Sequence, residues 1–135
     1  MSDYASLRQT LAINVPGYMH AGVINYMEHG IIPGTFLAAV LANDFVEAIG
    51  HADDYNRACL HGWACLLHND MPARSYGVWG SKQALEDWSA VGGMAGVRRS
   101  TAAQMDISRA TVGDERAKRL ATLVNAMGGK ARVVP

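Results

Sequence analysis

The expected fold depends on the stretch Pro33-Gly-Thr-Phe-Leu-Ala-Ala-Val-Leu-Ala-Asn-Asp-Phe-Val-Glu-Ala-Ile-Gly50. Its apolar residues recur at three- and four-residue spacing, so the pattern predicts one helix that begins at Pro33 and ends at Gly50. One stripe of this helix would hold Leu37, Val40, Leu41, Phe45 and Ala48. Asp44 falls inside the stripe, and Asn43 and Glu47 flank it. Because a carboxylate on an apolar face needs a partner, this polar cluster is the first candidate site.

The rest of the chain also has a helical pattern. Periodicity and helix-breaking residues predict helices over residues 3–13, 18–28, 53–68, 81–88 and 114–127. Asp53, Asp54 and Ser81 are the expected N-caps, and a loop with Pro72 is expected between Met71 and Gly80. A weak alternation over residues 103–109 predicts a strand that would pair with residues 131–134. The expected fold class is therefore mainly α, a small helical domain with a basic C-terminal extension and at most one short strand pair.

The formal charge is zero, but the two parts of the chain differ in sign. Residues 1–93 hold four basic and nine acidic side chains, a net of −5, whereas residues 94–135 hold eight basic and three acidic side chains, a net of +5. We therefore expect a helical acidic body over residues 1–93 and a basic extension over residues 94–135 with one amphipathic helix. The glycines at 92, 93 and 96 are the expected linker.

Two interpretations of this charge division stay open. The extension docks onto the body of its own or a neighbouring subunit, or Arg98, Arg99 and the segment 116–119 face an anionic ligand or nucleic acid. We favour docking, because a dedicated nucleic-acid binder usually has a clearly basic domain. Binding to nucleic acid is therefore not expected.

Length and composition restrict the class of protein. The 135 residues, half of them hydrophobic, are enough for one domain with a core. No apolar run is long enough to span a bilayer, and Asp3 and Arg8 interrupt the opening residues, so we expect a cytoplasmic protein without a signal peptide or membrane contact. Cys59 and Cys65 lie on different faces of an expected helix and are predicted to be reduced thiols.

A second kind of signal lies between His29 and Trp88. This segment contains Ile-Pro, Phe-Leu, Ala-Val-Leu, Asn-Asp, Glu-Ala and Ala-Asp in order, followed by Pro72 and Trp79-Gly80-Ser81. The pattern resembles a small protein family common in tailed-phage and prophage genomes, for which no shared activity is established. The resemblance implies an accessory phage protein expressed inside a bacterium. His51 departs from the family pattern, and the basic extension lies outside its common core.

Polar residues on the third helix suggest a ligand site. Asn43, Asp44 and Glu47 suit the hydroxyl groups of a ribose or the edge of a base, and the amides at Thr35 suit a phosphate. The alternative is a buried network that fixes helix packing, with Asp44 satisfied by backbone amides or by a side chain such as His29 or Arg57.

The aromatic residues of the expected loop offer a second part of such a site. Trp79 can stack on a base with help from Arg74 or Arg57, although Trp79 and Trp88 can equally plug the loop onto the core. The full set of candidate ligand-binding residues is Thr35, Asn43, Asp44, Glu47, Arg57, Arg74, Trp79, Arg98 and Arg99.

Metal and catalytic sites have weaker signals. His61, Cys65 and His68 share one helix face, which suits zinc, but no paired ligand motif accompanies them, and a core thiol or a subunit contact is the simpler interpretation. Acid–base chemistry could use Glu47, His51, Asp53 and Asp54, although Asp53 and Asp54 are more simply explained as helix caps. No nucleophile motif, phosphate-binding loop or paired-glycine fingerprint appears. We therefore expect no metal, no cofactor and no catalysis.

Together these signals favour a phage-type counter-defence protein. We expect it to assemble as a homo-oligomer and to sequester a small anionic nucleotide, an immune signal of the bacterial host, without changing it. One alternative is a protein-interaction module that masks a host defence or transcription protein. Another is a metal-dependent nucleotide hydrolase built on the histidine face.

Overall fold

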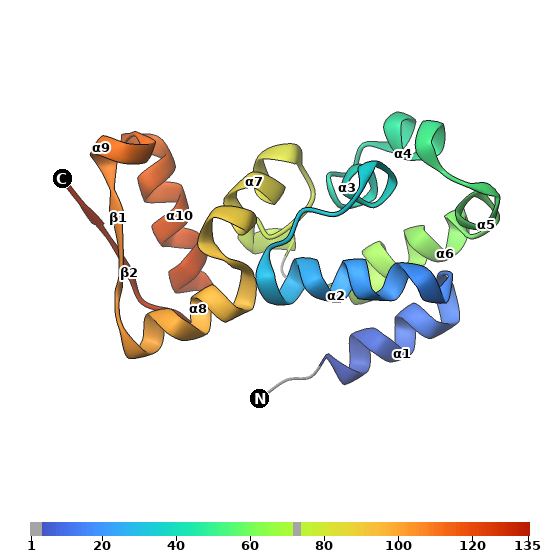
Figure 1. Ribbon diagram of the computed structural model, residues 1–135, viewed down its shortest axis with the longest axis horizontal. Helices are drawn as coiled ribbons and strands as arrows, with labels where there is room; N and C mark the ends of the chain where they lie inside the picture. The colour runs from blue at the N-terminus through green and yellow to red at the C-terminus, as the bar shows by residue number, and fades with distance from the viewer. Residues whose placement is uncertain (1–3, 72–73) are drawn as a thin grey trace.

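The computed structural model describes residues 4–71 and 74–135, and 72% of the chain is helical. Figure 1 shows an elongated molecule with the N-terminal helices at one end, a strand pair at the other, and α7 and α8 between them. The expected mainly α class with one short strand pair is confirmed. No helix in these two described ranges is long and apolar enough to cross a membrane.

The first half of the chain forms short helices. These are α1 (Ala5–Asn14), α2 (His20–His29), α3 (Thr35–Leu41), α4 (Phe45–His51), α5 (Asp54–Ala58) and α6 (Leu60–Cys65). A 3₁₀ turn at Gly17–Met19 precedes α2, a π-helical segment at Leu66–Asp70 extends α6, and a second 3₁₀ turn covers Arg74–Tyr76. The second half contains α7 (Lys82–Val91), α8 (Gly93–Ala102), β1 (Met105–Ser108), α9 (Arg109–Val112), α10 (Asp114–Ala126) and β2 (Ala131–Val134).

Most of the expected helices are present. The ranges 18–28, 81–88 and 114–127 correspond to α2, α7 and α10, and the range 53–68 corresponds to α5, α6 and the π-helical segment. Asp53 accepts the Asn56 N–H at 2.7 Å, and Ser81 accepts the Ala84 N–H at 3.0 Å, so both are N-caps as predicted. The expected start of the first helix at Asp3 and the loop residue Pro72 lie outside the described residues.

The helix expected over residues 33–50 is wrong. The chain forms α3 and α4 instead, because Asn43 adopts a left-handed conformation with φ of 60°. Asp44 then begins α4 as its N-cap and accepts the Glu47 N–H at 3.3 Å. Asn and Asp tolerate this backbone and compete with helical hydrogen bonds, so they can divide an apolar run. Asp44 is thus exposed at a helix start, and Phe45, expected in the core, is 73% exposed.

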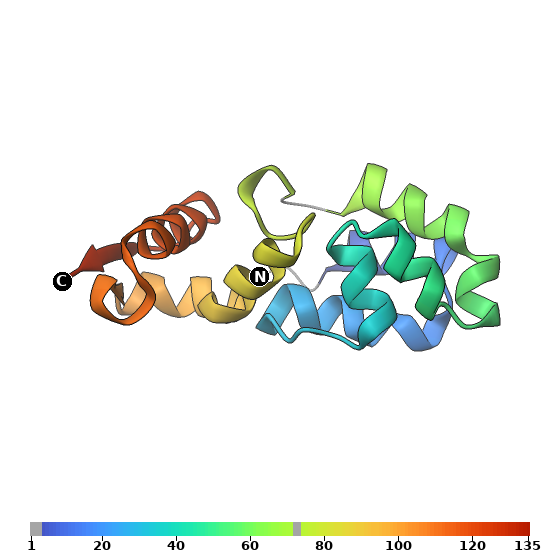
Figure 2. The same ribbon diagram turned by 90° about the horizontal axis from the view of Figure 1, so that it is seen from above.

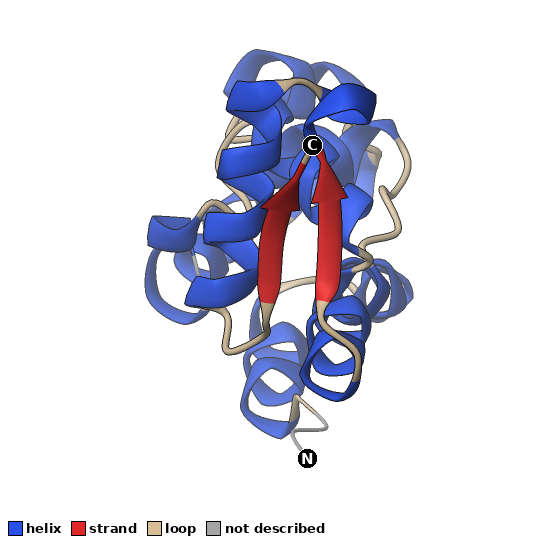
Figure 3. Cartoon of the chain, turned by 90° about the vertical axis from the view of Figure 1, so that its left-hand side faces the viewer, coloured by secondary structure: helices blue, strands red, loops and turns tan. Residues whose placement is uncertain are grey.

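The expected strand pair is confirmed and is parallel. Met105 lies opposite Ala131, and Ile107 lies opposite Val133. α9 and α10 form the crossover between the strands, and α10 packs on both of them. Figure 3 shows the pair face-on with helices behind it. Ile107 is buried, so this small unit has a core side of its own.

The glycines at 92, 93 and 96 form a tight corner, so the linker expected there is wrong. Gly92 ends α7 with φ of 82°, and α8 begins at the next residue. Gly93 is buried against α2, and a Cβ added there would lie 2.5 Å from the Gly30 nitrogen. Only glycine permits this approach of two backbones. The division into a body and an extension at this corner stays a prediction.

Ion pairs join the acidic and basic parts within one chain. Asp87 of α7 is only 4% exposed, and Arg119 of α10 binds it at 2.7 Å, with Arg116 at 3.5 Å. Arg98 of α8 pairs with Glu28 of α2. These contacts favour the interpretation in which the basic extension docks onto its own body.

The core joins α2, α7 and the loop before α7. Trp88 is fully buried and donates from Nε1 to the Tyr26 carbonyl oxygen at 2.9 Å. The Tyr26 hydroxyl donates to the Val78 carbonyl oxygen. Trp79 is 4% exposed, so both tryptophans pack in the core as in the simpler interpretation. Cys59 and Cys65 are free thiols, as expected.

Candidate functional site

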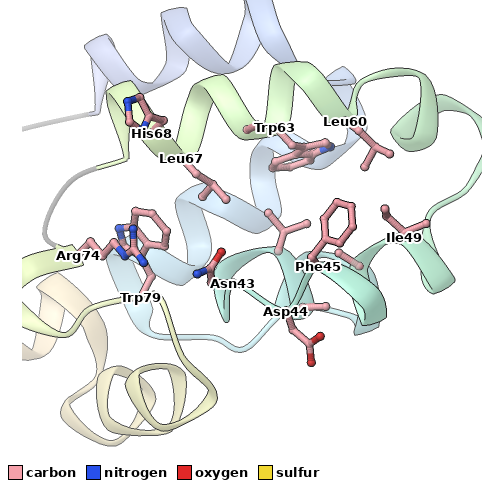
Figure 4. Close-up of a pocket in the computed structure, with 14 residues that line it drawn as sticks. Asn43, Asp44, Phe45, Ile49, Leu60, Trp63, Leu67, His68, Arg74 and Trp79 are labelled. Atoms are coloured by element: carbon pink, nitrogen blue, oxygen red, sulfur yellow. The ribbon is translucent and has the colours of Figure 1, made fainter.

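An apolar groove of about 360 Å³ lies between the α3–α4 hairpin and α6. Its walls include Val40, Phe45, Ile49, Leu60, Trp63 and Leu67. Figure 4 shows these side chains along the groove, with Asn43, His68, Arg74 and Trp79 toward one end. The groove therefore combines a long apolar part with a short polar end.

The break between α3 and α4 creates one wall of this groove. Because α4 starts again at Asp44, it folds back on α3 and turns Phe45 and Ile49 toward α6. Trp63 forms the floor of the groove, and its Nε1 donates to the Asn56 Oδ1 at 3.1 Å. The Trp63 ring also meets the Phe36 ring edge-on, with 5.6 Å between centroids. Trp63 is thus held by two contacts, whereas Phe45 lies at the exposed edge of the groove.

Arg74 is the main polar feature of the groove. Its guanidinium lies over the Trp79 ring, 5.4 Å from the centroid, and the ring itself is almost fully buried. Within residues 4–71 and 74–135, Arg74 forms no ion pair with a carboxylate. A guanidinium stacked on a ring keeps its planar N–H edge available for an anion. His68 and Asn43 lie at the same end.

The groove brings together four of the candidate ligand-binding residues, namely Asn43, Asp44, Arg74 and Trp79. Of the two cations expected to assist Trp79, Arg74 lies over its ring, whereas stacking of Trp79 on a base stays a prediction. Asp44 is among the lining residues, but Figure 4 shows its carboxylate turned away from Trp63. It caps α4 by accepting the Glu47 N–H, so a backbone amide satisfies it as the alternative expected, but Asp44 is exposed and belongs to no buried network.

Two other candidates line a neighbouring depression. Thr35 and Glu47 lie there together with Asp44 and Lys82, on the far side of the α3–α4 hairpin. Glu47 binds His51 at 3.2 Å, one turn along α4, and both side chains are exposed. Glu47 and His51, two of the candidates for acid–base chemistry, thus form an exposed pair of the kind common on protein surfaces.

The remaining basic candidates do not line the groove. Arg57 binds Asp54 at 3.1 Å on α5, and Arg98 pairs with Glu28. Arg99 lies on α8, where its guanidinium approaches the corner at Gly92. The structure therefore separates these cations from the stacked Arg74.

The histidine face of α6 forms a weak local contact. The Cys65 sulfur lies 3.4 Å from the His61 Nε2, while His68 lines the groove. Nowhere in the described chain do three His, Cys, Asp or Glu side chains gather in a group able to hold a metal ion. Of the residues considered for acid–base chemistry, Asp53 accepts a hydrogen bond from Tyr18, which lowers the pKa of Asp53 and raises the pKa of Tyr18 to about 12.

The apolar walls were missed by reasoning from sequence. The helical pattern places Phe45 in the core and gives no sign that Ile49, Leu60 and Leu67 line a groove. A signal was available, because Asn43-Asp44 followed by two large apolar residues is typical of a helix break with a new start. The contribution of α6 had no such signal, since α4 and α6 face the same groove only in the folded chain.

Comparison with known proteins adds no relative: no family model, curated protein or solved structure matches the chain.

Proposed function

We propose that this chain is a non-catalytic binding protein that holds a small anionic nucleotide in the groove. The observation that carries the proposal is Arg74, stacked on Trp79 and without an ion pair in the described structure, at the polar end of an apolar groove. The guanidinium suits a phosphate, and the apolar walls suit the faces of a base. The Asn43 amide supplies both a donor and an acceptor for a ribose or a base edge.

The proposed role is sequestration. The resemblance to a phage family supports capture of a bacterial immune signal in the cytoplasm of the host cell, where binding without chemistry is enough to silence the signal. We further propose that the protein acts as a homo-oligomer. Capture requires a protein concentration that matches the signal, together with slow release.

Titration calorimetry with a panel of nucleotides tests this proposal on three proteins. In Arg74→Met the side chain keeps its length but loses its charge, and the affinity should fall by at least tenfold because a hydrogen-bonded charge contributes about 1.5–3 kcal/mol. Arg57→Met is the matched control, since Arg57 is exposed and binds Asp54 away from the groove. Equal binding by both variants would exclude the groove, and conversion of the bound nucleotide would exclude simple capture.

A second function is favoured by the exposed part of α4. Phe45 is 73% exposed and Val46 is 76% exposed, next to the open groove. Large apolar side chains on a surface are typical of protein interfaces. We propose as the alternative that this surface masks a host defence or transcription protein.

The two functions separate at Val46, which does not line the groove. In a pull-down from bacterial lysate, Val46→Asp should lose a partner protein that Arg74→Met retains, if the surface of α4 is the interface. In the nucleotide account, Val46→Asp binds nucleotide as the wild type does and Arg74→Met does not. Both assignments would be rejected if Arg74→Met lost the partner protein while Val46→Asp kept it, and if Val46→Asp lost nucleotide binding while Arg74→Met kept it.

A further inference from the structure

We infer that the ligand of this groove carries one nucleobase and one phosphate group. This inference rests on the proposed function and narrows its ligand, because nucleotide immune signals also include dinucleotides. It depends on three properties of the groove: its volume, the position of its charges and the order of its side chains.

The volume limits the number of rings. About 360 Å³ lies near the lower end of the range of roughly 300–1,000 Å³ for small-molecule sites. One base with its sugar uses this space, and two bases with their sugars would exceed it. The apolar stretch between Phe45 and Leu60 is the part of the groove that suits the base.

The charges limit the number of phosphates. Arg74 is the one Lys or Arg side chain among the described residues that line the groove, and the His68 imidazole lies at the same end. A planar guanidinium binds two oxygens of one phosphate. The described lining residues offer no second Lys or Arg for a second phosphate.

The order of the side chains gives the ligand a direction. In Figure 4, Arg74 and His68 lie at one end, Asn43 lies next to them, and Phe45 and Leu60 follow toward the other end. A phosphate at Arg74 therefore places the sugar beside the Asn43 amide and the base against Phe45. The buried Trp63 forms the floor under this base position.

The inference is tested by titrating the full chain with four classes of probe. These are nucleoside 5′-monophosphates, 3′,5′-cyclic mononucleotides, two-base or two-phosphate ligands (cyclic dinucleotides and ADP-ribose), and inorganic phosphate. We expect at least one of the first two classes to bind one per chain, at least tenfold more tightly than every other class. The first two classes both carry one base and one phosphate group. Comparing their affinities shows whether the ligand is a 5′-monophosphate or a cyclic mononucleotide.

The possible failures are distinguishable. Equal or tighter binding of a cyclic dinucleotide or ADP-ribose overturns the inference and leaves the proposed function standing. Absence of binding by every nucleotide overturns both. Inorganic phosphate that binds as tightly as a mononucleotide removes the role of the base.

A matched pair of variants tests the position of the base. Phe45→Ala should lower mononucleotide affinity at least tenfold, because Phe45 lines the groove. Val46→Ala should not change it, because Val46 is equally exposed and lies outside the groove. Both residues are on the surface, so neither change should unfold the protein. Equal effects of the two variants would overturn the assignment of the base to Phe45.

Discussion

At the scale of single residues, Asp87 is the carboxylate that lies inside an apolar helix stripe and needs a partner, the role that the sequence suggested for Asp44. Asp87 lies on the same helical stripe as Ala84, Trp88 and Val91, and it is buried with Arg119 and Arg116 as its partners. The rule that a carboxylate inside an apolar stripe needs a partner is therefore sound. It failed at Asp44 because it assumed one continuous helix, and a single backbone conformation at the preceding residue decides that continuity.

Removal of the Asp87 carboxylate should destabilise the protein. We expect Asp87→Ala to lower the free energy of unfolding by about 2 kcal/mol, less than the 3–5 kcal/mol of a fully buried pair because the side chains of Arg119 and Arg116 are 42% and 38% exposed. Urea unfolding measures the change. Asp106→Ala is the control, since Asp106 binds Arg132 on an exposed strand and should cost less than about 1 kcal/mol. Equal losses would contradict the buried role of Asp87.

Ionisation of Tyr18 should weaken the fold at high pH. The hydrogen bond to Asp53 raises the pKa of Tyr18 from 10.0 to about 12, so the neutral form is favoured when the protein is folded. This contribution is complete below pH 10 and is lost as the pH rises from 10 to 12. Burial also raises the pKa of Tyr26, which adds to the same decline.

Urea unfolding at pH 8, 10 and 11 checks this expectation. Tyr18→Phe should show a smaller decline than the wild type across that interval, whereas Tyr76→Phe, which changes an exposed tyrosine outside this network, should follow the wild type. An unchanged decline in Tyr18→Phe would disprove the role of the Tyr18–Asp53 bond.

At the scale of elements, caps and periodicity predicted what is local. The N-caps Ser81 and Asp53 predicted the starts of their helices. The amphipathic pattern predicted α10, and the alternation of apolar and polar residues predicted β1. The corner between α7 and α8 was not predictable, because paired glycines suit a flexible linker as well as a close backbone contact. That distinction depends on Gly30, which lies far away in sequence.

Replacement of glycine by alanine should have opposite effects on stability at Gly62 and at Gly50. A Cβ at Gly62 would lie 1.8 Å from the Asn14 carbonyl oxygen of α1, whereas a Cβ at Gly50 meets nothing within 4 Å. We expect Gly62→Ala to destabilise the protein by about 1–3 kcal/mol through overpacking between α1 and α6. Gly50→Ala should stabilise it by about 0.5–1 kcal/mol, because alanine favours the helix.

Thermal unfolding followed by circular dichroism measures both changes. The expected result is a lower Tm for Gly62→Ala and a higher Tm for Gly50→Ala. A Gly62→Ala protein as stable as the wild type would show that α1 and α6 do not meet at this point.

At the scale of the whole molecule, the groove and the C-terminal strand pair lie toward opposite ends of an elongated chain. Figure 2 shows the strand pair at one end and the helices that line the groove at the other. The basic side chains that the sequence suggested for ligand binding therefore do not share one site. Arg98 binds Glu28, whereas Arg74 faces the groove. The position of Arg74 near Trp79 was predictable because the two residues are near in sequence. The apolar walls were not, because they come from separate helices.

We expect the protein to form an assembly that carries bound nucleotide. Native mass spectrometry of the wild type and Arg74→Met, each incubated with a small-molecule extract of bacterial cells, tests this most directly, with a denatured sample of each to release and identify the ligand. We predict a wild-type homo-oligomer that carries one intact mononucleotide per chain and an Arg74→Met protein that carries none. A wild-type protein without nucleotide, or equal loading of both proteins, would contradict the central claim that the groove at Arg74 binds a nucleotide.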